Sequence, residues 1–156
     1  MFAIREAKEK DIPVILHFIK AIADYEKLSH LVQATEESIK KTLFNNPVFA
    51  KCIIGYELYV PVGFALYFYN YSTFVSKPGI YLEDLFISTE HRGKGYGKAL
   101  LLELVKIAKQ QNCGRVEWSV LNWNKPAIDF YEKLGAKPLS EWTVYRLNEE
   151  DINRLG

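Results

Sequence analysis

The segment from Arg92 to Lys98 holds three glycines and three basic residues in seven positions: Arg92-Gly93-Lys94-Gly95-Tyr96-Gly97-Lys98. Alternating glycines let the backbone turn several N–H groups toward one point, because no side chain interferes. Such a group of N–H donors binds anions, and a helix that follows adds about half a unit of positive charge. A pyrophosphate fits this arrangement. The alternative is a tight strand-to-helix turn that binds nothing.

Neither of two common phosphate-binding patterns explains this loop. The pattern G-x-x-x-x-G-K-[ST] fails because Arg92 stands five residues before Gly97 and Ala99 follows Lys98. The dinucleotide pattern G-x-G-x-x-G fails because the glycines fall at positions 93, 95 and 97.

Two carboxylates, Glu83 and Asp84, interrupt the otherwise apolar strand sequence Ile80-Tyr81-Leu82-Glu83-Asp84-Leu85-Phe86-Ile87. An unpaired buried carboxylate costs several kcal/mol, so each needs a partner or a chemical role. Successive side chains of a strand point to opposite faces, so we expect different roles for the two. One would face a substrate cleft and the other would pair within the fold; purely structural pairing of both is the alternative.

Tyr131 follows a helix start at Asn124-Lys125-Pro126-Ala127, where Asn124 is a suitable cap and Pro126 lies in the first turn. On its own, a helical tyrosine beside Phe130 is typical of a core position.

The elements that must position these residues form an alternating α/β pattern. We predict a first helix that Asp11 caps, a second from Thr35 to about Phe44, a third from Lys98 to Gln111 with a buried stripe of Leu101, Leu104, Val105 and Ala108, and a fourth from Asn124 that stops at Gly135. The predicted strands are Phe2–Ala7, Phe49–Leu58, Val62–Tyr71, Ile80–Ser88, Val116–Leu121 and Trp142–Leu147, the second and third joined as a hairpin near Pro61. With no repeat or linker, residues 1–156 are expected to form a single α/β domain with a mixed sheet.

Bulk composition excludes several classes of function. The 156 residues carry 20 Lys and Arg against 19 Asp and Glu, which suggests neither nucleic acid nor an anionic membrane as partner. The cysteines, Cys52 and Cys113, and the three histidines are scattered, so no metal site is expected. The start lacks the apolar run of a signal peptide, and no apolar run approaches membrane-spanning length. We therefore expect a cytoplasmic protein.

The three chemical segments together resemble a known family. Arg92-Gly93-Lys94-Gly95-Tyr96-Gly97 matches the [QR]-x-x-G-x-[GA] loop of the GNAT acetyltransferase superfamily. Tyr81-Leu82-Glu83-Asp84 and the stretch from Trp123 to Tyr131 are similar to its diamine acetyltransferase branch, which includes the spermidine/spermine and thialysine acetyltransferases. Tyr25-Glu26-Lys27-Leu28-Ser29 and Tyr71-Ser72-Thr73-Phe74 resemble the same branch, so the similarity covers nearly the whole chain.

The resemblance implies a GNAT-like, mostly antiparallel sheet flanked by helices, acetyl-CoA as co-substrate and a homodimer. Tyr131 would be the general acid that protonates the departing thiolate, and Glu83 would be the base that faces the amine. Cofactor contacts would come from Leu85, Phe86, Ile87, Arg92, Gly93, Lys94, Gly95, Tyr96, Gly97, Lys98, Asn124, Lys125, Pro126 and Ala127. The cationic substrate would be held by Tyr25, Glu26, Glu83 and Glu141, the last by a loose match.

The expected reaction is direct acetyl transfer to the primary amine of a small diamine, polyamine or thialysine- or lysine-like substrate. Polyamine-acetylating members carry Asp and Trp where this chain has Ser72 and Phe74, which favours a shorter diamine or a lysine-like amine. Two other readings stay open: acetylation of protein N-termini or lysine side chains, and a non-catalytic acyl-CoA-binding regulatory module. Tyr67, Tyr69 and Tyr71 alternate along one strand and would either line an amine pocket or pack the sheet.

Overall fold

The computed structural model describes residues 1–156, which fall into two compact units, Met1–Ser119 and Val120–Gly156. The first unit holds strands β1 (Phe2–Glu6), β2 (Lys51–Glu57), β3 (Val60–Ser72), β4 (Lys77–Ile87) and β5 (Val116–Trp118), and helices α1 (Ile12–Tyr25), α2 (Glu36–Ile39) and α3 (Tyr96–Gln110). The second holds α4 (Lys125–Lys133) and α5 (Glu149–Leu155). No helix combines the length and the apolar character needed to span a membrane.

The five strands form one mixed sheet in the order β1-β2-β3-β4-β5. The first three pairings are antiparallel, and β4 pairs in parallel with β5. The β2–β3 turn is formed by Leu58 and Tyr59, both at positive φ, while Pro61 already lies within β3 opposite Tyr56. The predicted hairpin is therefore confirmed, and its turn lies a few residues before the predicted place.

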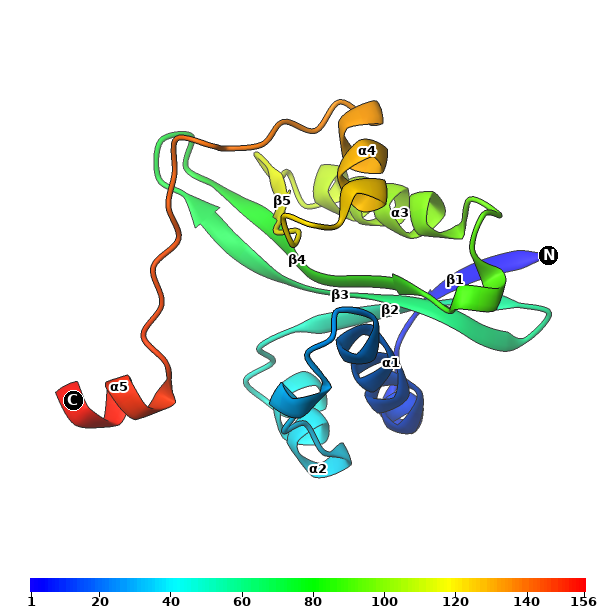
Figure 1. Cartoon of the computed structure of the whole chain (residues 1–156), viewed down its shortest axis with the longest axis horizontal. Coiled ribbons are helices and arrows are strands. Elements are labelled where there is room, and N and C mark those ends of the chain that lie inside the picture. The colour runs from blue at the N-terminus through cyan, green and yellow to red at the C-terminus, as the bar shows by residue number, and fades with distance from the viewer. The chain divides into compact units, whose positions relative to one another are not determined.

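Helices cover both faces of this sheet in the first unit (Figure 1). On one face, Ile15 and Phe18 of α1 pack against Ile54, Phe64 and Phe86 of three neighbouring strands. The other face carries α3, which contacts β2, β3 and β4. Its buried stripe is Leu100, Leu101, Leu104 and Ala108. Val105, which we predicted to be buried, is exposed, and Leu100 is buried instead.

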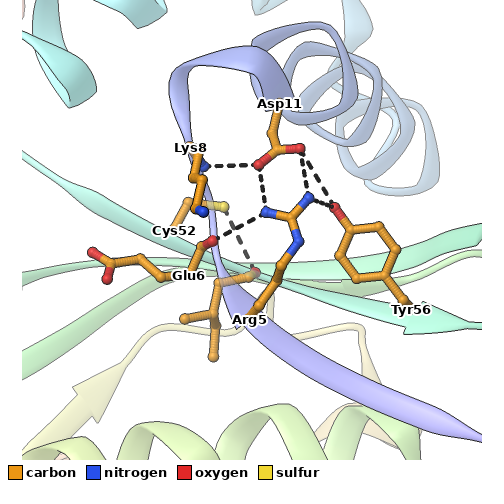
Figure 2. A network of polar contacts seen from close by, with 7 residues as sticks. Arg5, Glu6, Lys8, Asp11, Cys52 and Tyr56 are labelled. Carbon is orange, nitrogen blue, oxygen red and sulfur yellow. Dashed lines mark hydrogen bonds and ion pairs between the residues drawn. The ribbon is translucent and has the colours of Figure 1, made fainter. Parts of the chain in front are cut away.

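A polar network joins the start of α1 to the sheet (Figure 2). The guanidinium of Arg5 donates to both carboxylate oxygens of Asp11, at 2.7 and 2.9 Å, and to the hydroxyl of Tyr56 at 2.6 Å. Asp11 also accepts from the backbone N–H of Lys8 at 2.7 Å and makes no side-chain cap to α1. These bonds, first of all those from Arg5, hold the pKa of the Asp11 carboxyl below its usual range. Asp11 thus stands at the helix start as predicted, but it secures β1 rather than the first turn of α1.

The second unit confirms one predicted helix and corrects a predicted strand. Asn124 caps α4 by accepting from the N–H of Ala127 at 3.4 Å, and Gly135 follows the helix with φ +92°. Residues 142–147 form no strand, although the chain runs extended there before the unpredicted helix α5 (Figure 1). Alternating apolar residues are typical of a strand, but a strand exists only where another strand pairs with it.

Candidate active site

The glycine-rich loop has the backbone conformation that an anion-binding site requires. Gly93 and Gly95 adopt left-handed φ angles of +78° and +83°, and a Cβ on either would meet no protein atom within 4 Å. No backbone N–H of residues 93–98 donates a hydrogen bond within the protein, whereas the next one, Ala99, donates to Gly95 at 3.0 Å. The free donors lie at the N-terminus of α3, where the helix dipole favours an anion.

The basic side chains of the loop differ in their surroundings. Lys98 is exposed and takes part in no ion pair. Lys94 instead pairs with Glu57, at 2.9 Å. The Arg92 Nε donates to the Ile87 carbonyl at 2.9 Å, so this side chain lies against the end of β4.

The C-terminal half of β4 has a strand on one side only. Leu85, Phe86 and Ile87 pair with β3, at Ala65, Phe64 and Gly63 respectively. The parallel pairing with β5 involves only Ile80, Tyr81 and Leu82 and goes no further. Beyond Leu82, no other strand of the first unit pairs with this side of β4, so its backbone N–H and C=O groups form an open sheet edge. An extended ligand that pairs like a strand requires such an edge.

Glu83 occupies a β-bulge at the point where this edge begins. The register runs Leu66↔Asp84 and then Tyr67↔Leu82, so Glu83 is the extra residue of β4. Bulges re-aim side chains and are frequent beside active sites. We expected Glu83 and Asp84 to occupy opposite faces because side chains alternate along a regular strand. The bulge interrupts this alternation at Glu83.

Glu26, Glu83 and Asp84 form an acidic cluster between the end of α1 and the bulge. Burial raises the pKa of Asp84 to about 6, and the charges of Glu83 and Glu26 add to the shift. The pKa of Glu26 is also raised, by burial first and then by Glu83. The negative charges of these carboxylates therefore repel one another, and a ligand with positive charge would relieve this repulsion.

Tyr25 joins the acidic cluster to the loop. The guanidinium of Arg92 stacks over the Tyr25 ring at 4.4 Å and over the Phe86 ring at 5.3 Å. Tyr25 ends α1, and Glu26 caps it. The structure therefore brings together Tyr25, Glu26, Glu83 and Arg92, four of the residues that the sequence singled out.

The remaining predicted site residues belong to the second unit. Tyr131 lies on α4, half-buried, with its ring centroid 5.4 Å from that of Phe130. Asn124 is buried as the cap of this helix, and Lys125, Pro126 and Ala127 form its first turn. Glu141 is exposed in a turn.

The tyrosines of β3 and the two thiols take little part in this site. Tyr67 is buried and packs edge-on against Tyr69, with ring centroids 6.2 Å apart, as the packing alternative predicts. It follows Leu66, which belongs to the core beneath α1, so it faces away from α1 and its acidic end. Burial raises the thiol pKa of both Cys52 and Cys113, so neither is activated as a nucleophile.

One residue of this region was missed by sequence reasoning. Glu57 contacts the loop from the end of β2, although Lys94 and Tyr96 lie 37 and 39 positions further along the chain. A carboxylate that precedes a hairpin turn is common on protein surfaces, so its sequence context carries no signal of this contact.

The structure thus combines a mixed sheet that is open at the edge of β4 with a glycine-rich loop whose amides are free and a helix that follows it. The acetyltransferase (GNAT) family model matches residues 19–136, across the boundary of the two units. The chain belongs to the GNAT family and is an N-acetyltransferase.

Relatives with assigned activities share nearly the full length. The thialysine N-epsilon-acetyltransferase of Bos taurus is 37% identical over 98% of this chain and 96% of its own. The L-ornithine N5-acetyltransferase NATA1 of Arabidopsis thaliana is 32% identical over 97% of this chain and 86% of its own. Among solved structures, an integron cassette protein of V. cholerae aligns with a TM-score of 0.82 at 27% identity, over 99% of this chain and 96% of that one.

Proposed function

We propose that this protein transfers an acetyl group from acetyl-CoA directly to the primary amine of a small lysine-like substrate, such as thialysine, lysine, ornithine or a short diamine. One observation carries this proposal. Arg92 of the anion-binding loop contacts Tyr25, whose neighbour Glu26 interacts with Glu83, so a site for a diphosphate and a site for a cation meet along the same half of β4.

The free amides of residues 93–98 suit the pyrophosphate of coenzyme A, and the open edge at Leu85–Ile87 suits its amide-bearing arm. When bound, acetyl-CoA supplies an activated thioester. In this arrangement the N–H near Phe86 stabilises the oxyanion that forms on the attacked carbonyl. Asn124 to Ala127 would add further contacts from the start of α4.

The amine must lose a proton before it attacks. A lysine-like amine has a pKa of about 10.4 in water and therefore arrives as a cation. Tyr25, Glu26 and Glu83 attract this cation, with Glu141 as an additional ligand. Glu83, which the bulge sets apart from its neighbours, accepts the proton directly or through a water.

Tyr131 is the general acid that returns a proton to the thiolate of coenzyme A. A phenol with an ordinary pKa near 10 can donate to a thiolate as it leaves. Because the pKa of both thiols is raised, direct transfer is favoured over a cysteine-bound acetyl intermediate.

The names of these relatives and the residues of this chain both favour a short amine substrate over a long polycation. The names of the relatives include thialysine and L-ornithine, both of which carry a primary amine on a short chain beside an amino acid head group. Ser72 and Phe74 stand where the polyamine-acetylating members carry Asp and Trp, and Phe74 is fully exposed in the turn after β3. A long polycation therefore fits less well than a short amine.

The deciding experiment is thiol release from acetyl-CoA with a panel of thialysine, lysine, ornithine, short diamines, spermidine and a histone-tail peptide. Turnover with a small lysine-like amine is the expected result. Activity on the peptide alone would favour protein acetylation, and tight coenzyme A binding without turnover would favour a regulatory module.

Tyr131→Phe should lower kcat by about 10²-fold or more, as expected of a general acid. An unchanged rate at every pH would remove Tyr131 from this role.

We further propose that residues 1–156 act as one domain in a homodimer. Trp142, Val144 and Tyr145 lie in an extended segment with no strand partner and are 74%, 83% and 92% exposed. Paired with a sheet edge of a second copy, this segment would bury its apolar side chains and satisfy its backbone groups.

A further inference from the structure

Glu57, the last residue of β2, binds three side chains from the loop region with one carboxylate. The Lys94 ammonium lies 2.9 Å from Oε1 and 3.2 Å from Oε2. The hydroxyl of Tyr96 donates a hydrogen bond to Oε1, and the His91 Nε2 lies 3.4 Å from Oε2. The Tyr96 hydroxyl first, and then Lys94, hold the pKa of Glu57 below its usual range, so the carboxylate is ionised at neutral pH.

The pattern of the glycine-rich loop does not require the residues that make this contact, Lys94 and Tyr96. Both occupy positions that the pattern [QR]-x-x-G-x-[GA] leaves unspecified. The Tyr96 ring also stacks on Phe2 of β1, with centroids 4.0 Å apart and planes 7° apart. The side chains at the variable positions thus tie the loop to β1 and β2, while the glycines between them leave its amides free.

A glycine-rich loop has a reason to need such an anchor. Glycine loses more conformational freedom on ordering than any other residue, so a loop that orders only when it binds loses affinity. Gly93 and Gly95 have open space around them and no side chain to hold them in place. Glu57 is mostly shielded, with 21% of its side chain exposed, and is placed to fix the residues on either side of Gly95.

We propose that Glu57 is a positioning residue that holds the loop of residues 93–97 in its anion-binding conformation by binding Lys94 and Tyr96. Lys94 then acts through this anchor rather than as a direct phosphate ligand. The proposal rests on the proposed function in one respect, namely that the anion is the diphosphate of coenzyme A.

The test is Glu57→Gln, which keeps the size of the side chain and removes its charge. We expect the KM for acetyl-CoA and the Kd for coenzyme A to rise about 3- to 10-fold, as loss of charge-assisted hydrogen bonds implies. The kcat at saturating acetyl-CoA and the KM for the amine should stay within about two-fold. A general loss of structure would instead lower kcat and the melting temperature together.

Two further variants separate the anchor from a nonspecific effect. Tyr96→Phe removes the hydroxyl and keeps the ring on Phe2, so it should weaken coenzyme A binding and add little to Glu57→Gln, because the two groups act through one bond. Glu103→Gln is the control, since Glu103 pairs with Lys106 on the exposed side of α3, and should leave both constants unchanged.

Backbone NMR order parameters of residues 93–97 in the ligand-free protein test the anchor without any activity, because they report the ordering of amides that make no hydrogen bond. The order parameters should be lower in Glu57→Gln than in the wild type and unchanged in Glu103→Gln. Lower order parameters in a protein that binds no coenzyme A would keep the anchor and refute the proposed function. Unchanged order parameters with unchanged affinity would overturn the anchor. Tighter coenzyme A binding in Glu57→Gln would overturn it as well, since Lys94 would then act as a phosphate ligand once released.

Discussion

Glu83 and Asp84 are neighbours in sequence that occupy different positions in the sheet. Asp84 pairs opposite Leu66, while Glu83 is the unpaired residue of the bulge and is exposed. An exposed carboxylate can reach a substrate, whereas a half-buried one interacts chiefly with its neighbours. We therefore propose Glu83 for the chemistry and assign the energetic cost of burial to Asp84, which leads to separate predictions for the two.

Glu83→Gln should lower kcat/KM for the amine by about 10²- to 10⁴-fold at neutral pH, the usual contribution of a general base. The loss should shrink as the pH approaches the pKa of the amine, because a larger fraction then arrives deprotonated. A pH–rate profile from pH 6.5 to 10 measures this recovery. A loss of equal size at every pH would assign Glu83 to substrate binding or to structure.

Asp84→Asn should stabilise the fold at alkaline pH. The folded protein holds the Asp84 proton with a pKa of about 6, against 3.8 as the ordinary value, so the free energy of unfolding falls as the pH rises between these values. At pH 8 the substitution should raise that free energy by up to about 3 kcal/mol, and at about pH 3, below both pKa values, the two proteins should be equal. Urea unfolding at both pH values measures the difference; equal stability at pH 8 would show that Asp84 is ionised without cost.

The loop between β4 and α3 acts as a unit whose shape depends on left-handed residues. Gly95 is the residue before α3 and has a φ of +83°. A Cβ there would meet no atom, so the restriction is one of backbone conformation and not of space.

Gly95→Val should weaken coenzyme A binding at least about 10-fold, because a β-branched residue disfavours positive φ and turns the N–H groups away from their common point. Titration calorimetry measures the affinity. Asn112→Val is a matched control: Asn112 also has positive φ, at +55°, but follows α3. It should cost stability without changing the affinity, and an equal loss of affinity in both variants would refute the special role of the loop.

A second feature at the scale of the elements is the network of Arg5, Asp11 and Tyr56, which fixes the N-terminal end of α1 (Figure 2). The other end of α1 carries Tyr25 and Glu26, which the stacking of Arg92 holds beside β4. The helix that supplies the proposed amine ligands is thus secured at both ends.

At the scale of the molecule, the extended segment after α4 sets the proposed assembly. Val144→Asp should convert the proposed homodimer to a monomer, because it would bury a charge in the paired segment. Sedimentation velocity measures the change. Leu58→Asp, at an equally apolar and 69% exposed position in the β2–β3 turn, is the control and should stay dimeric. A dimer that persists in Val144→Asp would show that the segment is not the interface.

Local sequence was sufficient for the elements with strong signals. Thr35, Asn124 and Gly135 end or begin helices through bonds or backbone angles that depend only on near neighbours. Periodicity also depends only on near neighbours in the chain. It was therefore sufficient to predict the α/β class and to place the glycine-rich loop between a strand and a helix. The predicted strand at residues 142–147 was wrong because pairing is a property of two segments, which one segment cannot reveal.

The amino-acid sequence by itself determined which groups are present: a loop that can bind an anion, two carboxylates in an apolar strand, and a tyrosine on a capped helix. Only the tertiary structure decided their relations. The extra residue at Glu83, the contact of Arg92 with Tyr25 and the contacts of Glu57 with Lys94 and Tyr96 all depend on segments that are distant in the chain. Such contacts depend on sheet register and helix docking, which arise from the packing of the whole core and leave no pattern in the residues that make them.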